Sequence, residues 1–470
     1  MLTRRRTGWV VTLTAVGSLM AALDTLVVSN ALNTIRLDLG ASIAQLEWTL
    51  NAYNLSFAVL MITGTALGDR YGRRNMYAVG LGLFALASAA SALAPDVGLL
   101  IAARALQGAG AALIVPLGLA LLSAAFPPER RGMAIGMFSA VTGIAVALGP
   151  LIGGAVVQGI NWEWIFWVNV PIGAIAVPLV LTRIKESHGP DTAFDVRGLA
   201  LVSAGLFGIV WALVRGNDAG WGSLETLGSL VAGLALVAAF VAWERRAPAP
   251  MLPMRFFRSR AFSAGNAAIF FTLASLFSCV FFFSQLLQTG LGYDPLQAGL
   301  RLMPWTATFI TVAPLAGSLV DKIGERPLMV AGLSLQAIGT LWLALIVDPG
   351  VSYTSLLGPF IVGGVGVSMA IPSAQNSVVG SVESDALGKA AGVNSMMREL
   401  GGVFGIAMAV AVFAAAGSYL SPSAFMDGFG PAAGVSSGLA LCGALAALGL
   451  PARRRRLGIE PGVAAQEAAT

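Results

Sequence analysis

Long apolar stretches alternate with short polar gaps along nearly the whole chain. A helix needs about 20 apolar residues to cross a bilayer core of roughly 30 Å. Measured against that length, the pattern predicts fourteen membrane-spanning helices, centred in 9–30, 46–67, 77–94, 98–122, 134–157, 164–182, 198–214, 226–243, 263–288, 298–320, 328–347, 353–378, 392–416 and 432–450. The pair 198–214 and 226–243 is the weakest, because Arg215-Gly-Asn-Asp218 interrupts its apolar run; without the pair, twelve helices remain. Both counts are even, so the two termini share a side.

Polar linkers divide these helices into groups of six, two and six. The first group occupies residues 1–182, and a linker with two inserted helices occupies 183–260. The last six helices occupy 261–450, followed by a disordered cytoplasmic tail, 451–470. The sequence therefore predicts an all-α integral membrane fold in which two six-helix bundles, related as pseudo-repeats, flank two inserted transmembrane helices.

Two of the polar gaps carry nearly the same sequence. Residues 65–74 read TALGDRYGRR and residues 317–326 read GSLVDKIGER. In each copy an aspartate, Asp69 or Asp321, follows an apolar run, with a base beside it, a glycine three residues on and an arginine five residues on. Such an internal repeat indicates a duplicated architecture, as in membrane transporters built from two related halves.

Composition and charge agree with a membrane location. The chain is 57% hydrophobic and 11% charged, whereas a soluble domain is about 25% charged. Of its 28 Lys and Arg, 23 lie in segments that the fourteen-helix layout puts on one face. Because positive charge collects on the cytoplasmic side, we expect cytoplasmic termini and repeated loops in a multi-pass protein of the cell membrane. The basic pI has the same origin, so we expect the bilayer and a small-molecule substrate as partners, and no nucleic acid.

The chemistry of an enzyme is missing from the sequence. His188 is its only histidine, and Cys279 and Cys442 lie in predicted helices without a metal-ligand spacing. No Ser/His, paired-acid or metal constellation follows from these residues. We therefore expect no catalytic residue, no metal and no cofactor, and we expect a monomer.

Asp24 is the main anomaly of the first predicted helix. It lies past the middle of the span 9–30, where a charge costs about 2.5–3.5 kcal/mol on insertion scales and is a functional candidate by default. Because burial disfavours a charged carboxylate, Asp24 is interpreted as a proton carrier or as a counter-charge for cationic substrates. The alternative is a structural carboxylate hydrogen-bonded to a neighbouring helix.

Arg104 and Glu399 complete the set of proton-coupling candidates. Arg104, Gln107, Gly108 and Ala111 share one face of the span 98–122. Arginine stays ionised, so Arg104 would act on a neighbouring carboxylate or serve only as a strut between helices. Glu399, near the cytoplasmic edge of 392–416, is the only other acid expected inside the membrane and is a secondary coupling candidate.

Small residues and the repeated loops are candidates for conformational gating. Gly143, Ala147, Pro150 and Gly154 form a stripe on the span 134–157, next to Gly149 and Gly153. Small residues let helices approach closely, so the stripe is either a sliding seam between the halves or ordinary tight packing. In the loops, the gating candidates are Gly68, Asp69, Arg70, Gly72, Arg73 and Asp321; the alternative is positive charge that only sets the topology.

Candidates for the substrate-binding wall are polar or aromatic residues at cavity depth. They are Tyr53, Asn54, Gln107, Phe281, Gln285 and Trp305. The alternative for each is packing or contact with lipid.

These motifs resemble the major facilitator superfamily, in particular its fourteen-helix drug:proton antiporter branch. Residues 65–74 are similar to the superfamily's cytoplasmic signature, and Arg104-Ala-Leu-Gln107-Gly108-Ala-Gly110 is similar to its proton-coupling motif. Gly149-Pro150-Leu-Ile-Gly153-Gly154 resembles the antiporter motif, which is the most discriminating of the set. Leu23–Leu32 resembles the first-helix motif of the branch, with departures at Leu26, Ser29 and Asn30.

The resemblance implies proton-coupled efflux of amphipathic small molecules or drugs by alternating access, driven by the proton gradient. It also implies that the first repeated loop acts as a gate latch and that the second is a weaker copy. Two alternatives stay open: a dedicated exporter of a single natural product or lipid, and a membrane scaffold or sensor that transports nothing.

Overall fold

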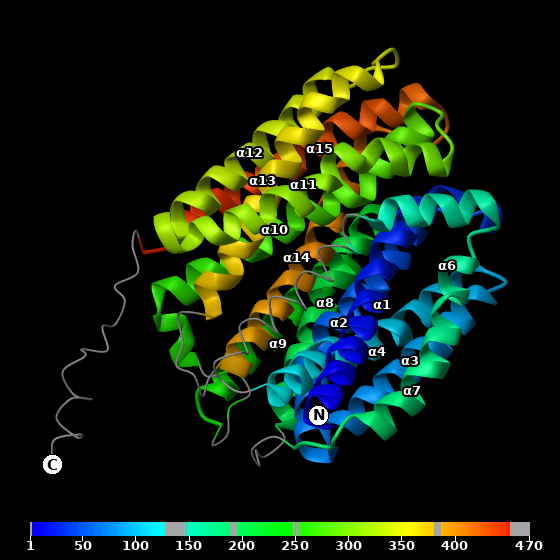
Figure 1. The fold of residues 1–470 in the computed structure, drawn as a ribbon. Helices are drawn as coiled ribbons and strands as arrows, with labels where there is room; N and C mark the ends of the chain where they lie inside the picture. Colours follow the sequence, from blue (N-terminus) through cyan, green and yellow to red (C-terminus); the bar gives the residue numbers. More distant parts are fainter. Residues whose placement is uncertain are drawn as a thin grey trace, which may run out of the picture.

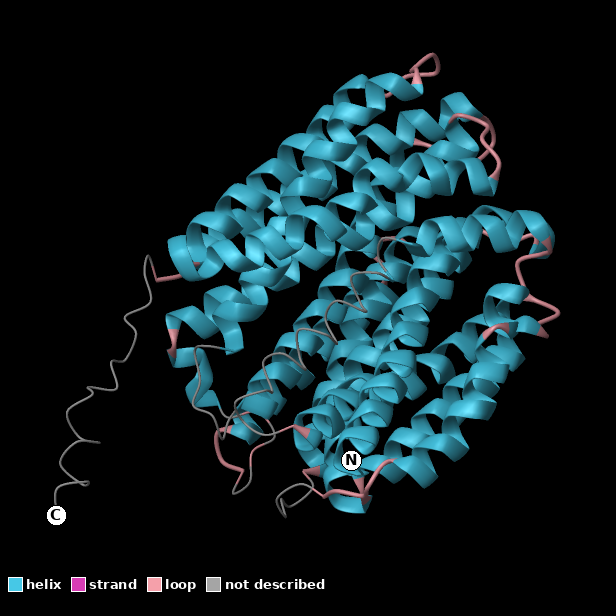
Figure 2. Cartoon of the chain, in the orientation of Figure 1, coloured by secondary structure: helices cyan, strands magenta, loops and turns pink. Residues whose placement is uncertain are grey.

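The computed structural model describes residues 2–126, 145, 148–188, 195–247, 250, 252, 254–379 and 387–451. All regular secondary structure in this described part is helical (Figure 2). Figure 1 places α3 and α7 on the opposite side of the molecule from α12 and α15. The chain thus forms an all-helical membrane fold with two groups of helices.

The first group is built around α4. Its members are α1 (Leu2–Leu39), α2 (Ile43–Tyr71), α3 (Arg73–Ala92), α4 (Val97–Ala125), α6 (Trp164–Trp167) and α7 (Asn169–Arg183). Helix α4 packs against α1, α2 and α3, and α7 packs against α3. Ser42 begins α2 with a capping box and Asp96 accepts a hydrogen bond from the Leu99 amide at the start of α4.

The second group is joined through α10, α12 and α13. Its members are α10 (Arg260–Gln285), the π-helix η3 (Leu286–Gly290), α11 (Pro295–Ile323), α12 (Glu325–Ile346), α13 (Tyr353–Val379), α14 (Leu387–Ala416) and α15 (Pro422–Leu448). Helix α10 packs against α14 and α15, α12 against α13 and α15, and α11 against α13.

Two further helices, α8 (Val196–Ala219) and α9 (Leu224–Glu244), pack against each other. They precede the short 3-10 helix η2 (Met254–Arg258). Both are long and apolar enough to cross a membrane, so the weakest pair of predicted spans is confirmed as helices of that kind. Helix α8 also contacts α2 and α14. The inserted pair therefore lies where the two groups meet.

Twelve described helices are long and apolar enough to span a bilayer. Helix α2 is a thirteenth if its two parts, which meet at 49° between Met61 and Thr63, count as one span. A shorter apolar helix, Leu148–Gly159, covers the end of the predicted span 134–157. The earlier part of that span lies outside the described residues, so the fourteenth helix stays a prediction. The predicted tail 451–470 lies outside them as well, except for Pro451.

The two repeated loops have the same backbone form. Gly72 joins α2 to α3 with φ +102°, and Gly324 joins α11 to α12 with φ +87°. Each glycine amide donates to the carbonyl four residues earlier, Gly72 to Gly68 at 3.0 Å and Gly324 to Val320 at 2.9 Å. Only glycine takes up this conformation without strain. The sequence repeat is therefore also a repeat of the turn.

The two halves of α1 pack in different apolar clusters. Residues Val10–Ala21 pack in an apolar cluster whose buried members all lie at or before Ile184. Residues Leu26–Ile35 belong instead to a large cluster that includes α10, α11, α13 and α15. Around α1, the apolar core thus joins the two groups at the end of the helix that is remote from the N-terminus.

Candidate functional site

The interior of the first group holds a buried ion pair. Asp24 of α1 and Arg104 of α4 meet through Oδ2 and Nη1, and their side chains are 1% and 0% exposed. Gln107, one turn along α4, donates from Nε2 to the other carboxylate oxygen of Asp24 at 2.7 Å. The same amide group donates to Oγ of Ser88 on α3 at 2.7 Å. Residues that are 80 positions apart in the sequence thus form one polar network.

Arg104 is held through its Nε and Nη1 atoms and by two aromatic rings, whereas its Nη2 is buried without a hydrogen-bond partner among the described residues. Its Nε donates to the Thr49 carbonyl of α2 at 3.0 Å and its Nη1 donates to Gln107 Oε1 at 2.6 Å. The guanidinium carbon lies 4.4 Å from the centre of the Tyr53 ring and 5.7 Å from that of Phe166. Arginine is suited to such stacking and forked bonding. The network therefore links α1, α2, α3, α4 and α6.

Glycines bring the backbones of these helices together. A Cβ at Gly108 would overlap the Tyr53 carbonyl of α2, and one at Gly110 would lie 2.8 Å from the Phe84 amide nitrogen of α3. In contrast, a Cβ at Gly82 of α3 would meet nothing within 4 Å. The glycines of the Arg104 motif thus allow α4 to approach α2 and α3 closely enough for Arg104 to reach Thr49.

The predicted small-residue stripe packs against helices of both groups. Gly149 lies against Leu26 of α1, and Gly153 lies 3.1 Å from the Val27 backbone, measured from the position of a Cβ. Gly154 lies against the Pro295 carbonyl of α11, in the other group. Gly143 and Ala147 lie outside the described residues. The described part of the stripe is therefore a seam with α1 on one side and α11 on the other.

Asn30 connects this seam to both groups. Its Nδ2 donates to the Pro150 carbonyl at 2.9 Å and to the Pro295 carbonyl at 3.3 Å. Its Oδ1 accepts from the Ser284 hydroxyl, and its backbone carbonyl accepts from Gln288 Nε2 at 2.9 Å. In the sequence, Asn30 stands out only as a departure from a motif. An amide side chain inside an apolar run was the signal that could have revealed its role.

The first repeated loop is bound within its own group. Asp69 Oδ1 accepts from Arg73 Nε at 2.7 Å, with both side chains 20% exposed. The carboxylate of Glu186, just after α7, accepts from the backbone amides of Arg74 at 2.8 Å and Asn75 at 3.3 Å. Each of these contacts stays within the first group.

The other loop candidates have less defined surroundings. Gly68 lies against Leu117 of α4, and exposed Arg70 lies over the ring of Tyr71 at 5.4 Å. The side chain of Asp321 is outside the described part of the structure. The gating role of both loops remains a prediction.

The comparison with protein families decides what kind of protein this is. Residues 14–406 match the Major Facilitator Superfamily. The chain belongs to this superfamily. It is therefore a multi-pass membrane transporter and not an enzyme, as the sequence predicted.

Relatives in this superfamily carry names of resistance and export proteins. The tetracenomycin C resistance and export protein of Streptomyces glaucescens is 37% identical over 84% of this chain and 73% of its own length. The multidrug resistance protein Stp of Mycobacterium tuberculosis is 34% identical over 86% of this chain and 75% of its own. The cephamycin export protein CmcT of Amycolatopsis lactamdurans is 32% identical over 88% and 86%.

Solved structures of the superfamily share the fold. The peptide transporter PepTSo superposes with a TM-score of 0.69 at 16% identity, covering 94% of this chain and 98% of its own. A D-xylose–proton symporter superposes with a TM-score of 0.67 at 18% identity, covering 94% and 98%. At these identities the likeness concerns the fold alone.

Glu47 is a further buried acid of the transporter, and it was not among the residues predicted from the sequence. Glu47 of α2 is 1% exposed, and its Oε1 accepts from Asn51 Nδ2 at 3.1 Å. Glu399 was expected to be the only acid in the membrane besides Asp24; Glu47, within the apolar segment Ala44–Met61, is a further candidate. Glu47 lies at the edge of the predicted span 46–67, so it read as a boundary residue. The signal was the helical spacing of Glu47, Asn51 and Asn54.

Glu399 is less enclosed than Asp24 and Glu47. It is half-buried on α14, and it makes no hydrogen bond or ion pair with another described residue. Its neighbour Arg398 has a buried Nε without a hydrogen-bond partner. Glu399 lies on the second group, whereas the Asp24 network lies within the first.

The structure separates the predicted substrate-wall residues into two sets. Tyr53 and Gln107 belong to the Asp24 network, and Tyr53 Oη also donates to the Ala21 carbonyl at 3.1 Å. Asn54 is fully buried next to them on α2. The others lie in the second group: Phe281 packs on Phe282, Gln285 accepts from the Tyr419 hydroxyl, and Trp305 packs edge-on to Phe283.

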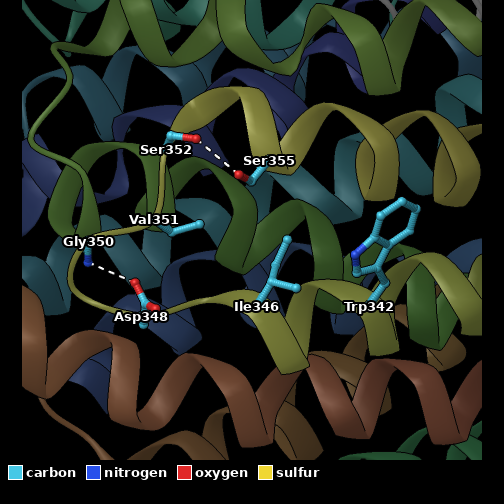
Figure 3. A pocket seen from close by; sticks show the side chains of 7 residues that line it. All are labelled: Trp342, Ile346, Asp348, Gly350, Val351, Ser352 and Ser355. Carbon is cyan, nitrogen blue, oxygen red and sulfur yellow. Dashed lines mark hydrogen bonds between the residues drawn. The ribbon is translucent and has the colours of Figure 1, made fainter.

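A surface hollow of about 540 Å³ has none of these residues in its lining; Figure 3 shows the residues that do line it. It is formed by the turn between α12 and α13, where the Gly350 amide donates to Asp348 at 2.8 Å. Its lining is Trp342, Ile346, Asp348, Gly350, Val351, Ser352 and Ser355. None of these is a predicted site residue, so the buried network is the better candidate for the functional site.

Proposed function

We propose that this transporter exports amphipathic small molecules in exchange for protons, by alternating access between its two halves. The observation that carries the proposal is the ion pair of Asp24 with Arg104, fully buried between α1 and α4. Export is supported by relatives that are named as resistance or export proteins. Proton coupling is supported by chemistry, because Asp24 is the member of the pair that can change its charge.

A proton on Asp24 would remove the attraction between α1 and α4. Arg104 would keep its bonds to the Thr49 carbonyl and to Gln107, so it stays in place while Asp24 is released. Moving one proton through 100 mV supplies about 2.3 kcal/mol, which corresponds to roughly a 50-fold change in the ratio of two conformers. The proton state of Asp24 is thus sufficient to bias the cycle.

The second half of α1 would pass this bias to the interface between the halves. Asn30, Gly153 and Gly154 lie at the seam where α1 and the helix Leu148–Gly159 meet α11. With cytoplasmic termini, this seam would lie on the outer side, and its contacts would close the transporter to the outside. Protonation of Asp24 from the outside would then require the bonds of Asn30 to break and re-form in every cycle.

The finer assignments belong to the same proposal. We assign fourteen spans with cytoplasmic termini, the division at 182 and 260, and a monomeric transporter. We assign Glu399 a secondary part in proton coupling, and the glycines of the seam and the repeated loops a part in gating. Tyr53, Asn54, Gln107, Phe281, Gln285 and Trp305 are assigned to the substrate pathway.

Transport in proteoliposomes tests the proposal. With an imposed proton gradient, the Asp24→Asn variant should lose proton-driven movement of ethidium, while it still inserts and folds. Asp38→Asn is the matched control on the same helix, since an amide oxygen can still accept from Trp162 Nε1 as Asp38 does at 2.8 Å. Full transport by Asp24→Asn at normal protein levels would refute the proposal.

A dedicated exporter of a single natural product is a second candidate. It is favoured by relatives named for the export of single compounds, tetracenomycin C and cephamycin. A panel of unrelated amphipathic compounds separates the two candidates. A response to one compound supports the dedicated exporter, and a response to many supports multidrug efflux.

A further inference from the structure

A polar stripe on α2 is not used by the Asp24 network. Glu47, Asn51 and Asn54 lie at i, i+4 and i+7, which places them on one face of the helix. All three are buried, with 1% exposure for Glu47 and none for the two asparagines. The next residue on this face, Ala58, packs with Met396 and Leu400 of α14. The stripe therefore continues a face that is directed at the second half.

The two neighbouring faces of α2 have other partners. Leu46 and Leu50 lie in the cluster with the second half of α1. Trp48 and Leu55 pack toward α8 and α14, with Trp48 5.6 Å from Trp211 between ring centres. Because the stripe lies between these two faces, it points into the space between α1 and α14. That space is where the two halves of the transporter face each other.

The two asparagines of the stripe have hydrogen-bonding capacity that no described residue uses. The Nδ2 and Oδ1 atoms of Asn54 and the Oδ1 atom of Asn51 are buried, and none of them has a hydrogen-bond partner in the described part of the chain. An unpaired buried polar group is expensive and is rare in native structures. The absence of a partner therefore points to a ligand that bonds to these atoms at another stage of the cycle.

The chemistry of the stripe selects the ligand. Asn51 donates from Nδ2 to Glu47, and its other polar side-chain atom, Oδ1, is a hydrogen-bond acceptor. The Glu47 carboxylate adds acceptors and negative charge. On the facing helix, Leu400 packs against Ala58 of the stripe's own face, and Val403 and Ala407 pack against Leu55 of the neighbouring face, so apolar side chains border the stripe. A ligand that fits has hydrogen-bond donors and a positive charge on one edge and an apolar body on the other.

Resting on the proposed export function, we propose that Glu47, Asn51 and Asn54 form the recognition edge for cationic amphipathic substrates that carry hydrogen-bond donors. The Asp24–Arg104 pair is then left for protons, and the α2 stripe chooses the cargo. Asn51 and Asn54 bind the hydrogen-bond donors of the substrate, and Glu47 binds its positive charge. Substrate recognition by the stripe is thus separate from proton coupling by the Asp24–Arg104 pair, although both sites involve α2 and its neighbours.

Two cations test this assignment by direct binding to the purified protein in nanodiscs. Ethidium has a fixed positive charge and two aromatic amines that donate hydrogen bonds, whereas tetraphenylphosphonium has a fixed charge and no donor. Asn51→Leu and Asn54→Leu should each weaken ethidium binding at least about tenfold and leave tetraphenylphosphonium nearly unchanged. Glu47→Gln should weaken the binding of both cations.

Matched controls keep a structural role apart from a binding role. Asn169→Leu removes a buried asparagine of α7, and Glu225→Gln removes an exposed carboxylate of α9. Both should leave the two affinities unchanged. Because the Asn54 side chain has no hydrogen-bond partner among the described residues, Asn54→Leu should not lower the melting temperature, whereas a structural role requires that it does.

The binding results test the recognition edge, and the transport results test the proposed function. Unchanged ethidium affinity in Asn51→Leu and Asn54→Leu, an equal loss for both cations, or no binding of either cation to the wild type would overturn the recognition edge. Ethidium binding through the stripe without proton-driven transport would refute the proposed function alone. Proton-driven transport with neutral stripe variants would refute the stripe alone.

Discussion

Asp24 and Asn30 lie six residues apart on α1, about 9 Å along its axis, and they bind opposite neighbours. Asp24 is tied to Arg104 of α4 within the first half. Asn30 is tied to the Pro295 carbonyl and to Gln288 in the second half. One short piece of helix therefore connects the buried charge to the interface between the halves.

The two members of the ion pair should differ in their effect on stability. Removing one partner of a buried pair leaves an uncompensated charge, at a cost of about 3–5 kcal/mol. Asp24 can take up a proton when Arg104 is absent, but Arg104 cannot lose its charge. We therefore expect the melting temperature to fall from the wild type to Arg104→Gln and further to Asp24→Asn. The double variant Asp24→Asn/Arg104→Gln should melt at a higher temperature than Asp24→Asn. Thermal unfolding in detergent measures the order, and a double variant less stable than Asp24→Asn would contradict the account.

Arg104→Lys should strongly slow proton-driven transport although it conserves the charge. Lysine has no planar fork to reach the Thr49 carbonyl, Gln107 and Asp24 together while lying over Tyr53. We expect a loss of at least about tenfold in the initial transport rate, since one charged hydrogen bond is worth about 1.5–3 kcal/mol. Arg215→Lys, at an exposed ion pair with Glu225, is the control and should transport normally. Normal transport by both variants would show that the fork geometry is unimportant.

Gly108→Ala and Gly82→Ala should have opposite effects on stability. An alanine at Gly108 overlaps the Tyr53 carbonyl, and overpacking costs about 1–3 kcal/mol. Gly82 is open, so alanine there gains up to about 1 kcal/mol of helix propensity. Melting temperatures of the two variants test this contrast directly. An equal effect at the two sites would mean that the approach of α4 to α2 does not depend on Gly108.

Asn30→Val should open the seam more often. The variant loses the bonds to Pro150 and Pro295 but keeps a side chain of similar width. With Cys279 and Cys442 replaced by serine, a cysteine at Leu296 should react faster with a membrane-impermeant thiol reagent. Ser29→Ala is the control, because among the described residues Ser29 Oγ donates only to the Leu26 carbonyl of its own helix. An unchanged reaction rate in Asn30→Val would rule out a closing role for Asn30.

The two repeated loops should contribute unequally. Asp69 pairs with Arg73, and the first loop is fixed further by Glu186. In the second loop, Glu325-Arg326-Pro327 replaces the double base, so the arginine partner is absent at the matching position. Asp69→Asn should therefore slow transport more than Asp321→Asn, measured as initial rates at matched protein levels. Equal slowing would mean that the loops act symmetrically.

The sequence predicted the helices well because apolar length and polar gaps are local properties. The inserted helices α8 and α9 and the turns at Gly72 and Gly324 follow from such local patterns. Asp24 and Arg104 were also visible as single anomalies, since a charge in an apolar run stands out in any one helix. Their location in separate predicted helices did not reveal that they touch.

Pairings and faces were beyond the reach of the sequence. The bonds of Asn30 join residues that lie 120 and 265 positions away, and a single chain holds no record of such contacts. Glu47 was overlooked because it lies at the edge of its predicted span, although the structure buries it. Phe281, Gln285 and Trp305 were predicted as substrate-wall residues for the same reason as Tyr53. Only the structure shows that Tyr53 lies in the first group of helices and the other three in the second.

The position of α8 restricts the motion of the whole molecule. Helix α8 touches α2 of one half and α14 of the other. If the halves rotate against each other, α8 cannot follow both, so it must slide along at least one of them. During such a rotation, α8 would remain in contact with the line where α2 and α14 meet, and its sliding surface would follow the relative movement of the two halves.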